Sequence, residues 1–394
     1  MSIKIDQKKV EELLLRGVDE VIDINNLKNK LLSGRRLRIK LGIDPTSPNL
    51  HLGRAVTLLK LKDFQLLRHK LVLIVGDFTG IIGDTSDKES ERPMLTEATV
   101  HKNMKTYVAQ AGVLLDIDKV EIHYNSHWLK KLNYTEIGLQ ADQFSLAEFM
   151  ARENIKRRFI AGKRISLREL LYPLMQGYDS VAVKADVEIG GTDQRFNLLA
   201  GRTMQTFYQQ RPQDILMTNL ILGTDGRKMS SSWANTINLM DEPQEMFGKI
   251  MSIGDNQIIS YFEHCTRVSM GKIKEYQKQL AAGKVNPKDI KTELAYEITK
   301  LYWKEIGARK GRDHFVSVFQ KKSLPKDLPK IKFAGKNIVD VLLSAKLVKS
   351  KSEARRLIKE KGVKVDGQVI QSAEEIVKKG RVVQKGKRHF VKII

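Results

Sequence analysis

The sequence predicts an α/β protein whose first domain is built on a doubly wound parallel, Rossmann-like sheet. An all-helical domain and a small α+β module are expected to follow it. Strand-like apolar runs alternate with amphipathic helices over the first two-thirds of the chain. From about residue 241 to residue 322 the pattern is helical throughout, and short helical and β-like segments complete the chain. The expected domains are 1–235, 236–322, a linker at 323–334 that contains Pro325 and Pro329, and 335–394.

The elements of the first domain follow from the spacing of apolar residues. The first 17 residues predict an amphipathic helix, and the continuous apolar run at 70–78 is typical of a strand buried on both faces. Because ligands of doubly wound sheets bind where strands turn into helices, the informative segments are these turns. The further predicted elements are a strand at 35–44, a helix at 53–67, a strand at 119–125 and a strand-to-helix turn within 186–202.

Composition excludes several classes of protein. With 394 residues and 41% hydrophobic content, the chain is long enough for more than one buried core. No apolar run approaches the roughly 20 residues of a membrane helix, and the first residues lack the apolar block of a secretory signal. Cys265 is the only cysteine, which excludes a disulfide framework and a thiolate zinc site. We therefore expect a cytoplasmic protein with no zinc and no membrane partner.

Positive charge is concentrated in the last segment. The formal net charge is +23, and residues 331–394 hold 17 Lys and Arg against 6 Asp and Glu. Such a field attracts phosphate backbones, although a charge run can also be a solvated surface. The concentration in one short module favours an RNA partner.

The stretch DPTSPNLHLG (residues 44–53) is the first segment that carries chemistry. Its prolines keep the chain irregular after a strand, and a helix then begins close to Gly53, which lets backbone approach a ligand. Thr46 and His51 would stand at the positive end of that helix, where phosphate binds well. The alternative is a simple capped turn.

The second such segment is GRKMSSSWAN (residues 226–235). It is a polar loop with adjacent cations and three serines, and it lies between the sheet region and the helical region. A loop of this kind can close over a polyphosphate through Lys228. The alternative is a surface turn with a helix cap at Ser232.

Taken together, the two segments resemble the signatures of class I aminoacyl-tRNA synthetases. The chain is similar to the bacterial tyrosyl-tRNA synthetases in particular, through DPTSPNLHLG, VGDFTGIIGDTSDKESER, YNSHW, YPLMQGYDS, EIGGTDQRFN and GRKMSSS in this order. The final module resembles the S4 RNA-binding domain. This resemblance implies a tyrosine–tRNA ligase that uses ATP with Mg²⁺ and acts on tRNA(Tyr). It also implies a homodimer formed through an insertion at about 129–164.

One predicted helix carries three polar residues on one face. Tyr172, Gln176 and Asp179 are spaced by four and then three residues, and their neighbours are apolar. A polar outer face is the alternative. The resemblance implies that Asp179 accepts a hydrogen bond from the substrate phenol and that Tyr172 and Gln176 contact its ammonium group. It places further residues at or near the tyrosine, namely Asp84, Asn125, Gln194 and Lys40.

The remaining site residues are assigned from the same resemblance. Asp193 in the Gly-Gly-Thr-Asp turn would bind the ribose. Mechanism would consist of positioning and charge, because the tyrosine carboxylate itself attacks the α-phosphate. The expected ATP contacts are Gly53, Gly191, Asp193, Met229, Ser230 and Ser231. The residues expected to act in catalysis are Thr46, His51, Arg54, Lys228, Lys88 and Arg92. The tail residues expected to bind tRNA are Arg355, Arg356 and Lys359.

Three positions depart from the family pattern. Arg54 stands where most members carry a second histidine, and Ser231 replaces the second lysine of Lys-Met-Ser-Lys-Ser. Lys40 occupies a position where many members place a tyrosine. We expect Arg54 to restore a charge near the phosphates, because its guanidinium matches phosphate oxygens. Three rivals remain open: a tryptophanyl-tRNA synthetase, a non-catalytic RNA-binding protein on a synthetase scaffold, and a generic nucleotidyltransferase.

Overall fold

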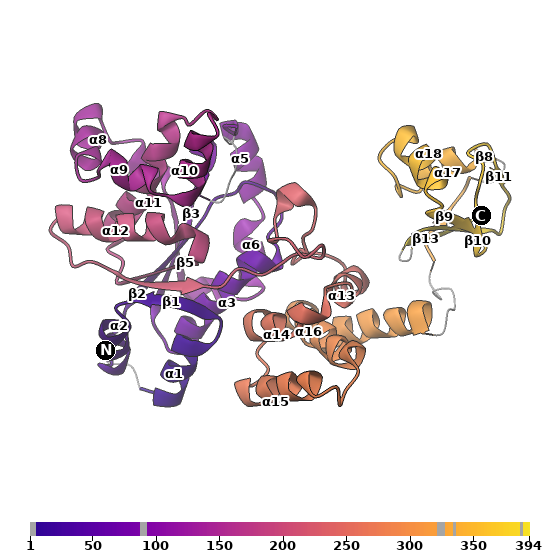
Figure 1. Ribbon diagram of the computed structural model, residues 1–394, viewed down its shortest axis with the longest axis horizontal. Coiled ribbons are helices and arrows are strands. Elements are labelled where there is room, and N and C mark those ends of the chain that lie inside the picture. Colours follow the sequence, from indigo (N-terminus) through magenta and orange to yellow (C-terminus); the bar gives the residue numbers. More distant parts are fainter. Residues whose placement is uncertain (1–4, 87–92, 321–327, 334–335, 387–388) are drawn as a thin grey trace. The chain divides into compact units, whose positions relative to one another are not determined.

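The computed structural model describes residues 5–86, 93–320, 328–333, 336–386 and 389–394. The chain forms two compact units, Met1–Ala308 and Arg309–Ile394. The first unit holds a central sheet and a set of helices, and the second is a small α+β module (Figure 1).

The central sheet has six strands in the order β1-β6-β5-β2-β3-β4. β2 to β6 run parallel to one another, which confirms the predicted doubly wound sheet. β1 departs from that prediction because it pairs with β6 in the antiparallel direction at the edge. An antiparallel edge strand on an otherwise parallel sheet is common in such folds. The strands are β1 Val18–Ile22, β2 Arg38–Ile43, β3 Lys70–Val75, β4 Val120–Tyr124, β5 Val187–Gly191 and β6 Asp214–Thr218.

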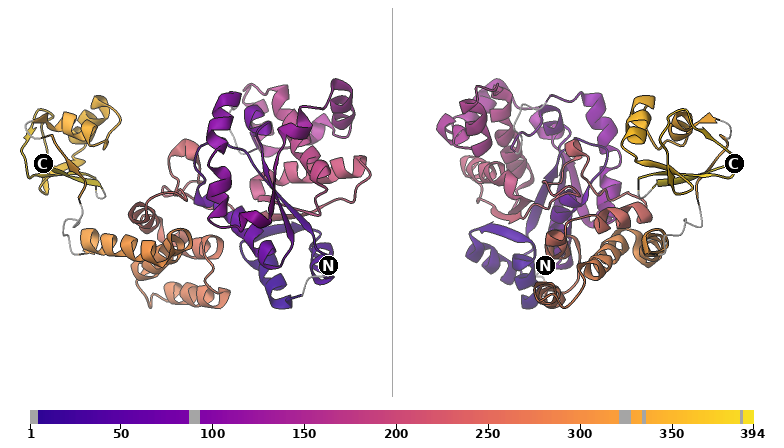
Figure 2. Two further views of the ribbon diagram at one scale, coloured as in Figure 1. Left: turned by 180° about the vertical axis from the view of Figure 1, so that it is seen from behind. Right: turned by 45° about the vertical axis from the view of Figure 1, so that its right-hand side comes forward.

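Helices cover both faces of this sheet. Figure 2 shows α3 (Leu52–Leu66) and α6 (Tyr107–Gly112) on one face, with α11 (Leu167–Val183) and α12 (Arg195–Phe207) on the other. Accordingly β3 is buried along nearly its whole length, as its continuous apolar sequence predicts. The other helices of this region are α1 Gln7–Leu15, α2 Ile24–Leu32, α4 Thr79–Ile82, α5 Glu97–Met104, α7 Ser126–Leu129, α8 Tyr134–Ala141, α9 Leu146–Met150 and α10 Glu153–Ile160.

The direction of strand addition reverses between β2 and β5. From β2 the chain continues through α3 to β3 on one side, whereas from β5 it continues through α12 to β6 on the other. Right-handed crossovers therefore place α3 and α12 on opposite faces and open a crevice at the carboxyl ends of β2 and β5. This is the position at which doubly wound sheets bind ligands.

The helix α11 crosses the sheet next to that crevice. It begins with a capping box, in which the Ser166 side chain accepts from backbone and Glu169 bonds back to Ser166. Glu169 also forms a buried ion pair with Arg158 of α10, at 2.5 Å between Nη1 and Oε2. Although burial alone would raise the pKa of Glu169, its hydrogen bonds, chiefly from Arg158, hold that pKa below the ordinary value. The start of α11 is thus fixed from two directions.

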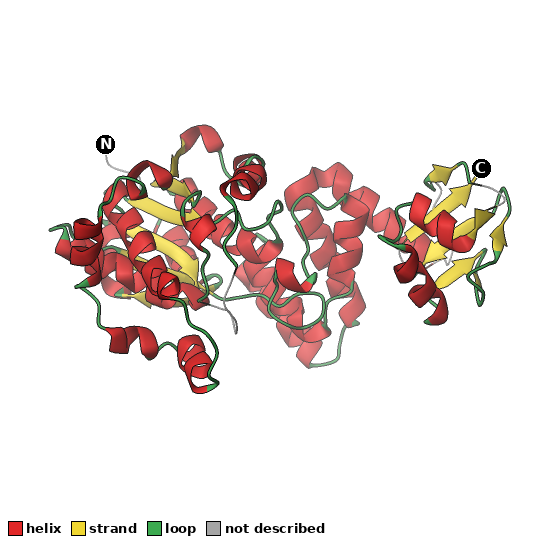
Figure 3. Ribbon diagram, turned by 90° about the horizontal axis from the view of Figure 1, so that it is seen from above, coloured by secondary structure: helices red, strands yellow, loops and turns green. Residues whose placement is uncertain are grey.

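The predicted helical region is confirmed (Figure 3). Lys304 has φ 58° and ψ −174° inside α16, so this long helix is divided in two. In the described parts of the chain, no helix has the length and apolar character needed to cross a membrane. The helices are α13 Pro243–Met251, α14 Ile258–Cys265, α15 Met270–Ala281 and α16 Pro287–Phe315.

The second unit packs two helices on a small sheet. Its five strands are ordered β10-β9-β12-β13-β7, and a separate pair joins β11 to β8. The stretch at 330–331, which we expected within an extended linker, pairs with β13 as strand β7. Apolar residues from both helices and from the strands form one core. The elements are β7 Lys330–Ile331, β8 Lys336–Asn337, α17 Ile338–Ser344, α18 Lys351–Lys359, β9 Val363–Val365, β10 Gln368–Val369, β11 Ile376–Val377, β12 Val382–Lys385 and β13 His389–Ile393.

Candidate active site

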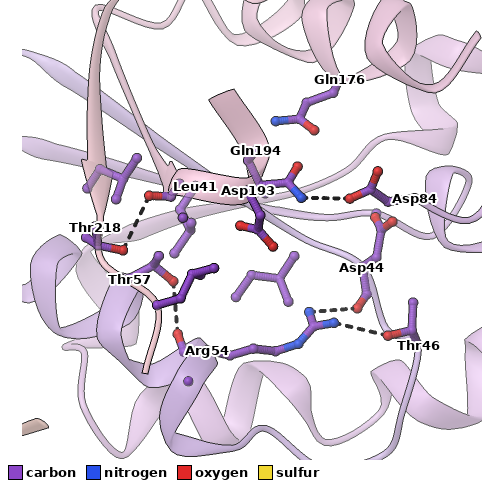
Figure 4. Close-up of a pocket in the computed structure, with 18 of the residues that line it drawn as sticks. Leu41, Asp44, Thr46, Arg54, Thr57, Asp84, Gln176, Asp193, Gln194 and Thr218 are labelled. Atoms are coloured by element: carbon purple, nitrogen blue, oxygen red, sulfur yellow. Dashed lines mark hydrogen bonds between the residues drawn. The ribbon is translucent and has the colours of Figure 1, made fainter. Parts of the chain in front are cut away.

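A cavity of about 270 Å³ opens at the carboxyl ends of β2 and β5. In Figure 4, Asp193 from the turn after β5 and Arg54 from α3 extend toward the same space. The cavity brings together fifteen residues that the sequence analysis assigned to the site, namely Thr46, His51, Gly53, Arg54, Asp84, Tyr172, Gln176, Asp179, Gly191, Asp193, Gln194, Lys228, Met229, Ser230 and Ser231.

Asp179 lies on the buried side of the cavity and is 4% exposed. Trp128 Nε1 donates to its Oδ1 at 2.7 Å, and Asn125 Nδ2 donates to its Oδ2 at 3.2 Å. Burial raises the pKa of Asp179 to about 7, against the lowering effects of the Lys40 charge and of these two donors. A carboxylate has about four lone-pair sites, so capacity remains for a hydroxyl donor from a ligand.

Asp44 organises the end of β2. It accepts from Tyr172 Oη at 2.8 Å and from Thr79 Oγ1 at 2.7 Å. Burial raises the pKa of Asp44, although both hydrogen bonds oppose the shift. A Cβ at Gly76 would lie 2.0 Å from Asp44 Oδ1, so only glycine lets β3 end this close to the carboxyl group. The sequence did not identify Asp44, whose only signal was a carboxylate directly after a predicted strand.

A second polar cluster joins the loop after α4 to the turn after β5. Gln194 Nε2 donates to Asp84 Oδ2 at 2.7 Å (Figure 4). It also donates to Ser86 Oγ at 2.8 Å. The backbone nitrogen of Ser86 donates to Asp84 Oδ1 at 2.9 Å. Asp84 is thereby held at the cavity wall as a carboxylate that an ammonium group can approach.

His51 and Gly53 stand at the start of α3. His51 is 7% exposed, and no described residue forms a hydrogen bond with its Nδ1. Burial lowers the pKa of His51 to about 3, helped by the charges of Arg54 and Lys228, so the ring is neutral at pH 7. A Cβ at Gly53 would lie 3.0 Å from His51 Nδ1, which explains the glycine. His51 makes no side-chain capping bond, so the capped-turn alternative is wrong.

Backbone pairing joins this segment to the residues that follow the Lys-Met-Ser loop. Leu52 N donates to Ile237 O and Leu239 N donates to Leu50 O, both at 2.9 Å. Met229 adds a contact, since Gly53 N donates to its Sδ at 3.3 Å. The two signature segments, far apart in sequence, therefore form one wall of the cavity.

The Lys-Met-Ser loop folds on itself and directs Lys228 into the cavity. Lys228 Nζ lies 2.6 Å from Asp193 Oδ2. Asn235 holds the loop closed, accepting from Ser230 N at 2.8 Å and donating to the Lys228 carbonyl at 3.0 Å. The helix cap that we considered at Ser232 is wrong, because Ser231–Trp233 form only a short 3₁₀ turn without a capping bond.

Arg54 contacts the irregular segment after β2. Its Nη1 donates to the Asp44 carbonyl and its Nη2 to Thr46 Oγ1, each at 3.1 Å (Figure 4). One guanidinium thus fixes Thr46 while its charge faces the same cavity as Lys228. Such a pair of cations suits a polyphosphate.

Two assigned residues lie behind the cavity wall. Asn125 contacts Asp179 but does not line the cavity. Lys40 is 0% exposed and pairs with Glu188.

Lys88 and Arg92 lie outside the described residues. Arg355, Arg356 and Lys359 are exposed on α18 of the second unit.

The comparisons with known proteins agree with this geometry. The family model described as "tRNA synthetases class I (W and Y)" matches residues 32–320, and the S4 domain model matches residues 337–383. The "Tyrosine--tRNA ligase" of Thermotoga maritima is 44% identical over 97% of this chain and 96% of its own. That of Shewanella oneidensis is 43% identical over 99% of this chain and 98% of its own.

The chain belongs to the class I tyrosyl-tRNA synthetases. A solved tyrosyl-tRNA synthetase complexed with L-tyrosine from Archaeoglobus fulgidus shares the fold, with a TM-score of 0.63 and 21% identity over 78% of this chain and all of that one. A truncated mitochondrial tyrosyl-tRNA synthetase from Aspergillus nidulans has a TM-score of 0.66 at 20% identity, over 79% of this chain and 94% of that one. Membership in this family removes the tryptophanyl and generic nucleotidyltransferase alternatives.

Three residues of this synthetase site escaped the sequence analysis. Asp44 binds Tyr172, Trp128 donates to Asp179, and Glu188 lines the cavity while pairing with Lys40. Trp128 occurs in the YNSHW motif, which was the available signal. Glu188 alternates with apolar residues in β5, a pattern that gives no indication of its partner.

Proposed function

We propose that this chain activates L-tyrosine with ATP to form tyrosyl-adenylate and pyrophosphate, and then transfers the tyrosyl group to the 3′ end of tRNA(Tyr). The observation that carries the proposal is the buried Asp179 carboxyl group. It lies in the cavity, keeps acceptor capacity, and is supported by two donors from α7 and the residue before it. An apolar ring would leave the remaining acceptor capacity of Asp179 unused, whereas a phenol would donate a hydrogen bond to it.

The opposite end of the amino acid requires acceptors for its ammonium group. Asp84, Gln176 and Tyr172 supply carboxylate, amide and hydroxyl oxygens in the same cavity. Glu188 accepts from Gln176 Nε2 at 3.1 Å, so the amide oxygen of Gln176 is the atom suited to an ammonium ligand. In this arrangement the substrate carboxylate points toward the cavity wall formed by the two signature segments, residues 44–53 and 226–235.

In the activation step, an oxygen of the tyrosine carboxylate attacks the α-phosphorus of ATP. The bond from that phosphorus to its bridging oxygen breaks, and pyrophosphate leaves. Thr46, His51, Arg54 and Lys228 would stabilise the charge on the leaving phosphates, while Asp193 accepts from the ribose. Mg²⁺ would arrive with ATP on phosphate oxygens.

ATP–pyrophosphate exchange with tyrosine, tryptophan and phenylalanine in separate reactions tests the proposal. We expect exchange with tyrosine only. The absence of exchange together with tight tRNA binding would instead support a non-catalytic RNA-binding protein on a synthetase scaffold, the alternative raised by Arg54 and Ser231.

Replacing Arg54 with alanine should lower the rate of tyrosine activation by about tenfold to a hundredfold, because it removes a charge next to the phosphates and the donor that fixes Thr46. The dissociation constant of tyrosine should change much less. Pre-steady-state activation and equilibrium tyrosine binding measure the two quantities. Arg54→Lys serves as the matched control, since it keeps the positive charge but removes the guanidinium group that donates two hydrogen bonds. A large loss of tyrosine binding with an unchanged rate would contradict this role.

For tRNA we propose contacts from α18. Arg355, Arg356 and Lys359 are exposed along this helix, which begins at Lys351 after the capping residue Ser350. Lysine and arginine on such a face bind phosphates with a steep dependence on salt. We expect replacement of all three by glutamine to make the plot of log K for tRNA binding against log salt concentration less steep. The decrease in slope should correspond to the loss of about two to three phosphate contacts, and pyrophosphate exchange should not change.

A homodimer formed through residues at about 129–164 is also proposed. Tyr134, Phe159 and Ile160 are 95%, 64% and 75% exposed on α8 and α10, and Leu139 and Leu146 are exposed nearby. Exposed apolar side chains at this density are typical of a surface that another chain covers. Sedimentation of the wild type and of Phe159→Glu distinguishes a dimer from a monomer.

The proposed roles of the segments are activation for residues 1–235, the anticodon side for 236–322 and RNA binding for 335–394. The expected linker at 323–334 is shortened by strand β7 at 330–331, which joins the RNA-binding module. Limited proteolysis would test these boundaries by cutting preferentially at the linker. Because charged tRNA is consumed by ribosomes, we propose the cytoplasm as the compartment. Fractionation of cells that express the tagged chain tests this placement.

A further inference from the structure

A buried ion pair lies between the sheet and the helix that carries Asp179. Lys40 on β2 and Glu188 on β5 are neighbours in the strand register, and their charged atoms are 2.9 Å apart. The two side chains are 0% and 1% exposed. A pair this deeply buried is costly to form unless its remaining hydrogen-bonding capacity is used.

The ammonium group of Lys40 also binds α11. Nζ donates to the carbonyl oxygen of Gln176 at 2.9 Å and to Ser180 Oγ at 2.8 Å, in addition to its ion pair with Glu188. The two acceptors on α11 are four residues apart, one on each side of Asp179.

Glu188 completes the network on the same helix. Its Oε1 accepts from Gln176 Nε2 at 3.1 Å and its Oε2 from Ser180 Oγ at 3.1 Å. A further hydrogen bond comes from Gln213, which precedes β6. Glu188 also lines the ligand cavity, so the network connects the sheet directly to the tyrosine site.

We propose that Lys40 is a positioning residue that determines selectivity for tyrosine over phenylalanine without touching the amino acid. Together with Glu188 it fixes the Gln176–Ser180 segment of α11, and so holds the acceptor for the phenol and the acceptor for the ammonium group at a set separation. This inference rests on the proposed tyrosine-activating function. In addition, the charge of Lys40 opposes the rise in the pKa of Asp179 that burial causes, which favours the carboxylate form.

The test variant is Lys40→Met/Glu188→Gln. It removes both charges together, so no buried charge is left without its partner. Thermal unfolding first establishes that it is folded. We then expect KM for tyrosine in pyrophosphate exchange to rise about tenfold, with kcat nearly kept. The ratio of kcat/KM for tyrosine to that for phenylalanine should fall at least about tenfold, the effect of weakening one charged hydrogen bond. A merely structural pair would not change this ratio in a folded variant.

The matched control is Lys30→Met/Asp214→Asn. Lys30 Nζ lies 2.8 Å from Asp214 Oδ2, and Asp214 is fully buried on β6, but neither residue lines the cavity. Its selectivity ratio should equal that of the wild type. Ser180→Ala is a milder second variant, which removes one acceptor of Lys40 and one donor to Glu188 but keeps the ion pair itself. About a threefold lower ratio is expected.

Each outcome decides one question. Unchanged selectivity in folded Lys40→Met/Glu188→Gln, or in Ser180→Ala if the double variant does not fold, overturns the role of Lys40. A wild-type protein without tyrosine-dependent exchange defeats the proposed function itself. If the wild type shows tyrosine-dependent exchange and the variants keep the wild-type selectivity for tyrosine over phenylalanine, only this inference is overturned.

Discussion

Asp179→Ala should reduce kcat/KM for tyrosine by about tenfold to a hundredfold while leaving the low activity with phenylalanine nearly unchanged. The variant loses a hydrogen bond between a phenol and a charged acceptor, which contributes about 1.5–3 kcal/mol. Phenylalanine never makes that bond. Pyrophosphate exchange with the two amino acids measures the ratio, and equal losses for both would show that Asp179 only supports the fold.

Asp214→Ala is the control for this substitution, because Asp214 is a fully buried carboxylate on β6 that does not line the cavity. It should destabilise the protein without changing selectivity. If the carboxylate form of Asp179 is the acceptor, kcat/KM for tyrosine should rise with pH through about 7, where Asp179 titrates.

The same titration affects stability. The folded-state pKa of Asp179 is raised above its ordinary value of 3.8, so between about pH 4 and pH 7 the native state binds more protons than the unfolded state. The contribution of Asp179 to stability is therefore lost as pH rises through this window. Asp179→Asn should show a smaller fall in Tm from pH 5 to pH 8 than the wild type.

Lys228→Met should lower kcat for tyrosine activation by about a hundredfold to a thousandfold and leave KM for tyrosine nearly unchanged. Its ammonium group lies 2.6 Å from Asp193, on the side of the cavity that we propose for the nucleotide, and in that proposal its charge is needed most when pyrophosphate departs. Single-turnover formation of tyrosyl-adenylate measures the effect. A change in KM for tyrosine alone would place Lys228 outside the transition state.

The adjacent Arg227 supplies the control. It is exposed, pairs with Asp225 at 2.6 Å and lies over the Trp233 ring at 4.8 Å, but it does not line the cavity. Arg227→Met removes one positive charge from the same loop. Activation should change by no more than a fewfold, because an exposed pair contributes little and a distant charge is screened.

Much of the sheet could be predicted from local sequence. β3 is a continuous apolar run, whereas β2, β4 and β5 mix apolar residues with charged or polar ones, and the structure confirms a strand in each of the four segments. β1 and β6 were not identified. Their pairing joins residues about two hundred positions apart, and a five-residue segment such as DILMT does not reveal its partner.

The site was predictable to the extent that its residues occur in short motifs. Motifs placed His51, Asp179 and Lys228 in one cavity, but they gave no information on which side chains meet across the fold. Lys40 illustrates the limit, since its meaning depends on Glu188, and only the pairing of β2 with β5 brings the two together. Nothing in either local sequence encodes that contact.

The backbone pairing of Leu50 and Leu52 with residues 237–239 has a consequence for substitutions in the cavity. Main-chain hydrogen bonds do not depend on side-chain identity. Substitutions at Arg54 or Ser231 therefore leave the backbone hydrogen bonds between the two segments intact. A substitution of a charged side chain at such a position thus changes the electrostatics of the cavity and leaves the backbone that carries it in place.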